Sequence, residues 1–306
     1  MVNIFIDGSA GTTGLKLAER LAGREGLNFL TADEEHRKDA ATRRELINAA
    51  DIAFLCLPDA SAVESVSFIE NPNTAVIDTS TAHRTAEGWT YGFPELTGHD
   101  KIAAAKRIAN PGCHASGFIA LIAPLTRAGL IAKDAALTAF SLTGYTGGGK
   151  KMIAQYEDPS RDPLYDAPRL YALTQQHKHL PEMQKVCGLE TAPLFCPIVA
   201  DFPRGMEVTV PLHKSQLKGT AKDIAEVYRE IYAEGLVRYA DAADADGLLS
   251  AGAMAGKDSM QVSVFGNDER ILLVSRFDNL GKGASGAAIQ NMNILLGVDE
   301  ATGLNI

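Results

Sequence analysis

Two hydrophobic patterns alternate through the first third of the chain. Short apolar runs, typical of buried strands, occupy residues 2–7, 28–32, 51–58 and 75–78. Apolar residues at helical spacing follow the first run at Leu17, Ala18 and Leu21, and a helical stretch, residues 60–69, follows the third. Continuous apolar runs suit the inner strands of a parallel sheet, which is buried on both faces. The alternation therefore predicts a doubly wound α/β domain.

The second half of the chain has a different hydrophobic pattern. Residues 206–212, 260–264 and 271–275 alternate or run apolar, as the strands of a second sheet do. A helix is predicted between the first two of these runs, over residues 222–233, and another over residues 287–296. We therefore expect a second, α+β domain after the parallel one.

A glycine-rich turn joins the first predicted strand to the first predicted helix. Its spacing is Gly-x-x-Gly-x-x-Gly, which differs from the standard dinucleotide fingerprint. Glycines in this context let the backbone approach a pyrophosphate at the N-terminus of the helix. A tight turn that only packs the helix on the strand is the alternative. The candidate cofactor ligands are Gly8, Ser9, Ala10, Gly11, Thr12, Thr13 and Gly14.

Charged residues follow the second predicted strand. Asp33 stands where an acid would bind the ribose hydroxyls of NAD. Arg37 and Lys38, with Arg43 and Arg44 beyond them, could instead meet the 2′-phosphate of NADP. A solvated, charged helix over the same stretch is the structural alternative.

Cys113 is the most informative single residue. It follows a Pro-Gly turn and precedes an apolar run with helical spacing over residues 118–125. We therefore expect the thiol at or near a helix N-terminus, where unpaired N–H groups and the helix dipole favour the thiolate. A thiolate is a strong nucleophile, and the same N–H groups could hold an oxyanion. The alternative is a small buried residue at the start of a core helix.

Three further loops have the composition of ligand sites. Ser80 and Arg84 follow the strand at residues 75–78 and could hold a phosphate or a carboxylate. An ordinary polar turn would have the same sequence pattern and is the alternative. Residues 91–96 are predicted as a loop, too irregular for a helix or a central strand. A glycine-rich stretch that ends at Lys150 indicates either close approach to a ligand or a flexible loop.

Two histidines precede another predicted helix. His177 or His179 could carry a proton near neutral pH, and Glu182 could orient His179 from the first turn. Surface histidines are the alternative. We expect no metal site, because zinc would need more ligands at a recognisable spacing.

Composition narrows the range of possible functions. The 306 residues carry a net charge of −9 without a basic block, so nucleic acid is not expected as a partner. No apolar run reaches the about 20 residues that span a membrane, and no signal-peptide pattern is present. The cysteines lack Cys-x-x-Cys spacing, which predicts a reduced, cytoplasmic protein with free thiols. They are Cys56, which we expect to fill the core, and Cys113, Cys187 and Cys196.

Taken together, these motifs resemble the short (type 2) form of the N-acetyl-γ-glutamyl-phosphate reductase family of arginine biosynthesis. The segments that carry the resemblance, in the family's order, are residues 8–14, 79–84, 91–96, 110–117, 143–150, 177–182 and 278–293. Two places depart from the longer form of the family. His114, Ala115 and Ser116 stand where Tyr-Pro-Thr is usual, and Lys150 stands where an arginine is frequent.

The resemblance implies a fold like that of aspartate-semialdehyde dehydrogenase. A Rossmann-type domain would span residues 1–112 and be completed by the C-terminal helix within residues 283–306. A catalytic and oligomerisation domain would span residues 113–282, with an open sheet used in a homodimer or homotetramer.

The resemblance also implies the chemistry. NADP would be the cofactor, with Asn279 and Gly283 joining the glycine turn in binding it. Cys113 would form a thioester with the acyl group of N-acetylglutamyl phosphate, and His179, or else His177, would move the proton. The implied substrate-binding residues are Ser80, Arg84, Lys150 and Glu182.

Four other functions compare less well with the sequence. Aspartate-semialdehyde dehydrogenase shares the chemistry, but residues 177–182 favour the acetylglutamyl enzyme. A lysine-pathway reductase with a carrier-linked substrate is disfavoured by the acidic surface. A non-catalytic NADP-binding sensor would leave the thiol and histidine motifs without purpose. A cysteine hydrolase would suit the Cys/His pair but not the glycine turn.

Overall fold

The computed structural model describes residues 1–306, which divide into two compact units. The first unit contains residues 1–111 and 287–303, and the second contains residues 112–286 and 304–306. The chain thus leaves the first unit after Pro111 and re-enters it at Ala287.

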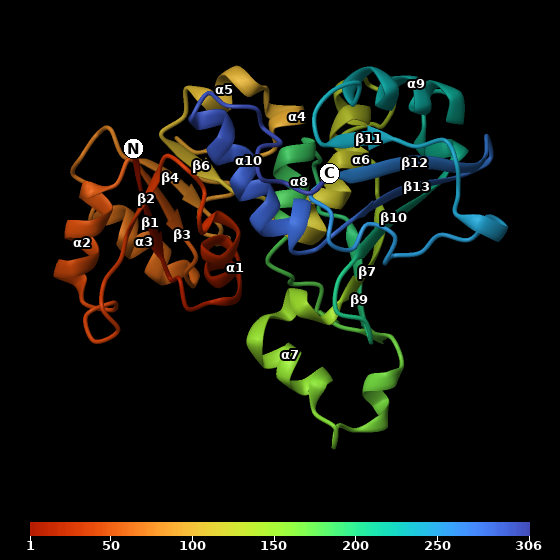
Figure 1. Cartoon of the computed structure of the whole chain (residues 1–306). Helices are drawn as coiled ribbons and strands as arrows, with labels where there is room; N and C mark the ends of the chain where they lie inside the picture. The colour runs from red at the N-terminus through yellow and green to blue at the C-terminus, as the bar shows by residue number, and fades with distance from the viewer. The chain divides into compact units, whose positions relative to one another are not determined.

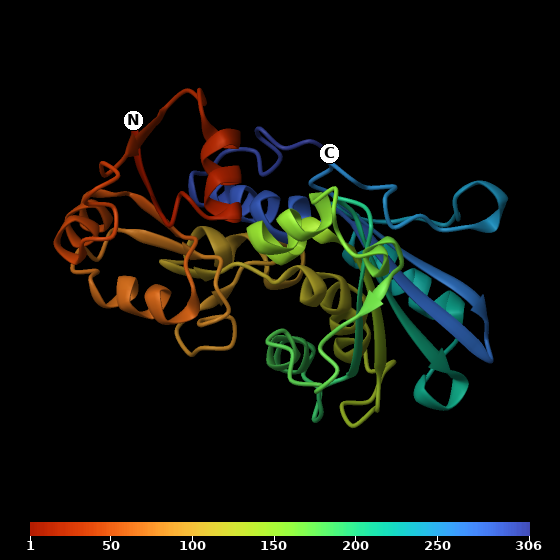
Figure 2. The same ribbon diagram turned by 90° about the horizontal axis from the view of Figure 1, so that it is seen from below.

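The first unit is built on a six-stranded parallel sheet with the order β2-β1-β3-β4-β6-β5. Its strands are β1 (Val2–Asp7), β2 (Leu27–Leu30), β3 (Ile52–Leu55), β4 (Ala75–Asp78), β5 (Thr90–Tyr91) and β6 (Arg107–Ala109). Its helices are α1 (Thr12–Leu21), α2 (Ala40–Ala49), α3 (Asp59–Ser67), α4 (Pro94–Thr97), α5 (His99–Ala103) and α10 (Gly286–Leu295). Helix α1 lies on one face of the sheet, and α2 and α3 lie on the other (Figures 1 and 2). This is the doubly wound arrangement that the hydrophobic pattern predicts.

Strands β3 and β4 are buried along their whole length, as expected for the interior of a parallel sheet. Phe5, Ala53, Leu55 and Val76 from three adjacent strands pack together with Ile47 of α2. The strand order reverses between β1 and β3, and ligands of such sheets bind at this switch point, beyond the carboxyl ends of the strands.

Two local expectations are wrong. The stretch after β2 is not a helix from its start: turns precede α2, which begins at Ala40 because the Asp39 carboxylate accepts a hydrogen bond from Thr42 N–H as its N-cap. The segment expected as an irregular loop contains β5 and the one-turn helix α4. Pro94 opens α4, where its missing N–H costs nothing.

The second unit is built on a seven-stranded mixed sheet with the order β11-β12-β13-β10-β7-β9-β8. Its strands are β7 (Thr138–Gly144), β8 (Arg169–Leu170), β9 (Leu194–Ala200), β10 (Met206–His213), β11 (Val237–Tyr239), β12 (Met260–Asn267) and β13 (Arg270–Phe277). Its helices are α6 (Cys113–Arg127), α7 (Gly149–Glu157), α8 (Leu180–Cys187) and α9 (Ala221–Ile231). Helix α7 lies beyond the ends of β7 and β9 (Figure 1).

Helix α6 is the core of this unit. It packs on β10 and β13 and contacts α8 and α9, and its residues from His114 to Leu125 are buried. Burial alternates along β10, because only one face of the sheet is covered by these helices. None of the helices in either unit combines the length and the apolar composition needed to cross a bilayer.

Helix α10 closes the first unit. The Asn291 side chain donates a hydrogen bond to the Gly92 carbonyl at 2.9 Å, and the Gln290 side chain donates to Glu95 at 3.1 Å. Ala288 and Met292 on the same helix are fully buried. The sequence-distant end of the chain therefore completes the parallel-sheet unit.

Candidate active site

The glycine turn after β1 has a backbone that other residues would not adopt without strain. Gly8 has φ = +89°, and a Cβ atom there would lie 2.4 Å from the carbonyl oxygen of Cys56. A Cβ atom on Gly14 would lie 2.3 Å from the Gly8 carbonyl oxygen. Glycine at these two positions thus lets the turn pack tightly against Cys56 and against itself at the start of α1.

A cavity of about 790 Å³ opens beside this turn within the first unit. Gly8, Ser9, Ala10 and Gly11 line it, as do Leu57, Pro58 and Ser61 after β3. Thr12, Thr13 and Gly14 belong instead to the first turn of α1. The cavity therefore lies at the switch point of the sheet, where a dinucleotide is expected.

The charged residues after β2 divide into two groups. Arg37 and Lys38 line the cavity, whereas the Asp33 carboxylate is bonded to the backbone and ring of His36 at 2.8 Å. Arg44 forms an exposed ion pair with Glu70. Arg37, Lys38 and Arg43 are thus the members of this group that line the candidate cofactor site.

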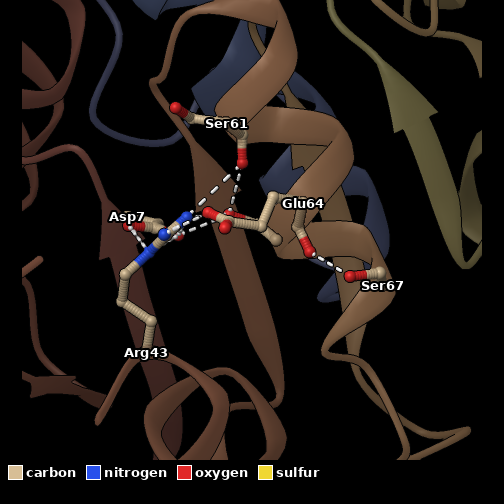
Figure 3. Close-up of polar contacts among 6 residues, drawn as sticks. Asp7, Arg43, Ser61, Glu64 and Ser67 are labelled. Atoms are coloured by element: carbon tan, nitrogen blue, oxygen red, sulfur yellow. Dashed lines mark hydrogen bonds and ion pairs between the residues drawn. The ribbon is translucent and has the colours of Figure 1, made fainter. Parts of the chain in front are cut away.

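Arg43 was expected among the candidates for a cofactor phosphate, and it does line the cavity, but its guanidinium is engaged by protein carboxylates. It is buried against the Asp7 carboxylate at the end of β1, at 3.1 Å, and also pairs with Glu64 at 2.7 Å (Figure 3). The sequence gives no sign of this pairing, because Asp7 and Arg43 are 36 positions apart.

The loop after β4 is held together by its own polar side chains. Ser80 is buried, and its hydroxyl donates to Asp78 at 2.7 Å. The Arg84 guanidinium donates to the carbonyl oxygens of Asn110 and Thr79, both at 3.0 Å. These two candidate substrate ligands thus sit in an ordered loop that reaches the end of β6.

Cys113 is the first residue of α6 and is half-buried. No side chain caps this helix, and its first turn carries no acidic residue. The positive end of the helix dipole is therefore available to stabilise a thiolate. This is the position that the sequence predicts for the thiol.

Two residues from distant parts of the second unit shape this helix start. The buried Glu182 carboxylate accepts a hydrogen bond from the Gly112 N–H at 2.9 Å. A Cβ atom on Gly283 would lie 3.0 Å from the Cβ atom of Cys113, so glycine there leaves room for the thiol residue. Both were expected as ligands, and the structure shows them in contact with the Gly112–Cys113 turn.

Three imidazoles pack together beside this turn. The His114 ring lies 5.6 Å from the His177 ring and 5.7 Å from the His179 ring, and the latter two rings are 4.7 Å apart. His177 and His179 are thus grouped around the residue that follows Cys113.

His114 has its own fixed partners. One ring nitrogen lies 2.7 Å from the Ser141 hydroxyl and the other lies 2.6 Å from the Tyr171 hydroxyl. Burial, with a further contribution from His177, lowers the pKa of His114 to about 3. His114 is therefore neutral near pH 7 and does not compete with His177 and His179 as a proton carrier.

No sequence pattern singles out Tyr171, Ser141 or Gln175, because each contacts a residue far from it along the chain. The Gln175 side-chain amide donates to the Phe195 carbonyl at 2.7 Å and accepts from the Phe195 N–H at 2.9 Å. The Phe195 ring in turn packs against His114 and His177. The two Gln175–Phe195 hydrogen bonds thus anchor the loop that carries His177 and His179.

The remaining candidates lie elsewhere in the second unit. Lys150 is exposed near the start of α7. Asn279 is buried, and its amide accepts from Gly205 N–H and donates to the Thr146 hydroxyl, both at 3.0 Å. Asn279 thus links two loops, and a role in cofactor binding stays a prediction.

Two family models match this chain. Residues 3–105 match the model described as "Semialdehyde dehydrogenase, NAD binding domain", and residues 113–279 match "Semialdehyde dehydrogenase, dimerisation domain". The chain thus belongs to the semialdehyde dehydrogenase class.

Relatives define the family more closely. The N-acetyl-gamma-glutamyl-phosphate reductase of Rhizobium etli is 46% identical over 304 residues, which cover 96% of this chain and 98% of the relative. The protein of the same name from Brucella suis is 46% identical over 305 residues, with the same coverage. The chain belongs to the N-acetyl-gamma-glutamyl-phosphate reductase family, which confirms the resemblance seen in the sequence.

Solved structures agree on the fold. Aspartate semialdehyde dehydrogenase II of Vibrio cholerae superposes with a TM-score of 0.72 at 16% identity, covering 97% of this chain and 98% of that one. The enzyme of Francisella tularensis gives 0.70 at 14% identity, covering 97% and 100%. These similarities confirm the predicted fold class.

Proposed function

We propose that this chain reduces N-acetyl-L-glutamyl 5-phosphate to N-acetyl-L-glutamate 5-semialdehyde and phosphate, with NADPH as reductant, in arginine biosynthesis. The name of the relatives supports the substrate and the family model supports a nicotinamide dinucleotide. The observation that carries the chemistry is the thiol of Cys113 at the uncapped N-terminus of α6, followed by the histidine cluster.

Cys113 would act as the nucleophile. Its thiolate attacks the acyl-phosphate carbonyl carbon, the carbon–sulfur bond forms, and the bond to the phosphate oxygen breaks with its electron pair leaving on phosphate. Backbone N–H groups at the start of α6 would hold the oxyanion that develops during attack. The product of this step is a thioester on Cys113.

Bound NADPH supplies the hydride that reduces this thioester. His179, or else His177, would then hold a proton for the oxyanion of the tetrahedral adduct and take it back as the thiolate departs. His114 does not serve here, because its lowered pKa keeps it neutral. The choice between the other two rings is left to mutagenesis.

The first unit fits a dinucleotide. The glycine turn from Gly8 to Gly11 lines a cavity that has the volume of a cofactor site. Arg37 and Lys38 would bind the 2′-phosphate that distinguishes NADP from NAD. Arg84 and Ser80 are the candidates for the substrate phosphate, with Lys150 a further one.

We further propose a cytoplasmic homodimer or homotetramer. The match of the second unit to a dimerisation domain supports assembly. Phe140, Leu194 and Leu272 on strands of its sheet are 45%, 56% and 42% exposed, and a partner subunit would cover them.

The proposal is tested with a Cys113→Ser variant. We expect it to lose nearly all turnover, because a serine hydroxyl is a far weaker nucleophile at neutral pH. A His179→Asn variant should retain activity reduced by about 10²–10⁴-fold, the usual contribution of general acid–base help. The assay is phosphate-dependent oxidation of N-acetylglutamate semialdehyde with NADP, run in parallel with aspartate semialdehyde.

A Cys196→Ser variant is the matched control, since Cys196 lies on β9 and outside the proposed machinery. Near-normal turnover by Cys113→Ser would exclude the covalent route. Preference for aspartate semialdehyde would assign the chain to the other enzyme. Slow labelling of Cys113 by iodoacetamide, as slow as that of Cys187, whose pKa burial raises, would favour a non-catalytic sensor.

A further inference from the structure

Asp7 occupies an unusual place for a carboxylate. It is the last residue of β1, directly before Gly8, and only 3% of it is exposed. Burial of an unpaired charge is strongly unfavourable. A negative charge directly before the turn that would receive a pyrophosphate would also repel that ligand. Asp7 therefore needs a counter-charge for two separate reasons.

Arg43 of α2 supplies that charge with a fork of donors. Its Nε lies 3.2 Å and 3.1 Å from the two Asp7 carboxylate oxygens, and its Nη2 lies 3.1 Å from Asp7 Oδ2. The Ser65 hydroxyl of α3 donates a further bond to Asp7 Oδ2 at 2.7 Å. Elements far apart in the sequence thus converge on this one carboxylate.

The remaining donors of Arg43 also point at protein groups. Nη1 donates to Glu64 Oε2 at 2.7 Å, and Nη2 donates to the Ser65 hydroxyl at 2.5 Å and to the Ser61 carbonyl at 3.4 Å (Figure 3). Arg43 is itself 7% exposed. It borders the cofactor cavity, yet each of its three guanidinium nitrogens already donates to a protein group.

We propose that Arg43 is a positioning residue for the dinucleotide: it neutralises Asp7 beside the glycine turn, so that the turn can accept a pyrophosphate. Arg43 acts through Asp7 and does not bind a phosphate itself. This inference rests on the proposed function only in that the first unit binds a nicotinamide dinucleotide.

The proposal predicts a specific pattern of affinities. An Arg43→Met variant leaves the Asp7 carboxylate without its partner, and binding of NADPH and NADH should weaken by at least about tenfold each, with their ratio unchanged. An Asp7→Asn/Arg43→Met double variant removes the repelling charge as well, and should recover both affinities to within about threefold of the unmodified protein. A ligand of the 2′-phosphate would behave differently, because its loss affects NADPH alone.

The experiment is a fluorescence titration of the full chain with NADPH and with NADH. Lys38→Met is the matched control, since Lys38 lines the same cavity and is proposed to meet the 2′-phosphate; it should weaken NADPH binding but leave NADH unchanged. Thermal unfolding is followed for every variant. The KM for NADPH in the reductase assay should rise in Arg43→Met while kcat at saturation stays within about twofold.

The inference would be overturned by unchanged NADPH affinity in Arg43→Met, by a loss confined to NADPH, or by a folded double variant that does not recover. If Arg43→Met does not fold, the folded double variant and Arg43→Lys still test the inference. Arg43→Lys keeps the positive charge, and its NADPH affinity should lie within a few-fold of that of the unmodified protein. Loss of NADPH binding in a folded Arg43→Lys variant, comparable with the tenfold loss expected of Arg43→Met, overturns the inference. NADPH binding that follows the expected pattern without reductase turnover would sink the proposed function and leave this inference standing.

Discussion

At the scale of single residues, His114 shows how the second unit limits which histidines can titrate. The ring is enclosed by Phe195, Tyr171 and two other imidazoles, and both of its nitrogens have hydroxyl partners. A charge on this ring would be desolvated and would lie close to His177 if that ring were protonated. The neutral form is therefore the stable one in the folded chain.

This lowered pKa predicts a pH dependence of stability. In the unfolded chain His114 binds a proton below about pH 6.5, whereas in the folded chain it does so only below about pH 3. The unfolded state thus gains protons first, and His114 should destabilise the fold as pH falls from about 6.5 toward 3, by up to about 1.4 kcal/mol per pH unit. Above pH 6.5 it should have no effect.

The measurement is urea unfolding between pH 5 and pH 7.5 for the unmodified chain and for His114→Gln. The variant will lose some stability at every pH, because its contacts with Ser141 and Tyr171 change. Only the slope is diagnostic, and it should be shallower in the variant. Parallel slopes would contradict the pKa of His114.

Local sequence signals predict some of the candidate site residues but not others. The position of Cys113 at a helix start followed from the Pro-Gly turn and the apolar run after it, which are local signals. The burial of Arg43 could not be foreseen, because its partner Asp7 lies on another element and charged residues usually face solvent. Tyr171 had no local signal at all, since its contact with His114 spans 57 positions.

At the scale of elements, α6 contains a proline that its surroundings accommodate. Pro124 has no N–H to donate to the carbonyl of Ala120, one turn earlier. The Tyr232 hydroxyl donates to that carbonyl instead, at 2.7 Å, and the Tyr228 hydroxyl donates to the Leu121 carbonyl at 2.6 Å. Side chains near the end of α9 thus complete the hydrogen bonding of α6.

A Tyr232→Phe variant should therefore destabilise the second unit by about 1–3 kcal/mol, the usual cost of an unsatisfied buried carbonyl. A Pro124→Ala/Tyr232→Phe double variant should recover part of this loss, because alanine restores the N–H that bonds Ala120. The measurement is a double-mutant cycle by urea unfolding. Additive losses in the cycle would show that Tyr232 stabilises the unit by packing alone.

The fold was predictable where elements are long and periodic, as in β1, α1, β10 and β13. Strands β5, β8 and β11 were missed because two or three residues cannot show a period. Strand β9 was missed for another reason: it contains Pro197, which ordinarily argues against an inner strand. Its pairing with β7 over residues 194–200 is set by tertiary contacts.

At the scale of the whole molecule, the first unit is assembled from both ends of the chain. Residues 1–111 supply the sheet, and residues 287–303 supply α10, which bonds Gly92 through Asn291. Three crossings of the chain therefore link the two units: after Pro111, before Ala287 and after Gly303.

A fragment of residues 1–111 should consequently fail to unfold cooperatively or to bind NADPH, because the apolar surface that α10 covers would face water. The same fragment joined by a flexible Gly/Ser linker to residues 287–303 should regain both properties. Circular dichroism melting and NADPH fluorescence would measure this. Cooperative melting of the short fragment would show that α10 is dispensable.

Because the first unit is made of two separate chain segments, the two units cannot be completed at the same time during translation. Residues 112–286 emerge from the ribosome as one continuous stretch, whereas the first unit must wait for α10, which is made afterwards. The nascent chain can thus bury α6, the helix that carries Cys113, while the first unit still lacks α10. The helix that carries Cys113 should therefore be in place before the first unit can bind a dinucleotide, and any chaperone that assists the protein should engage the N-terminal third for longest.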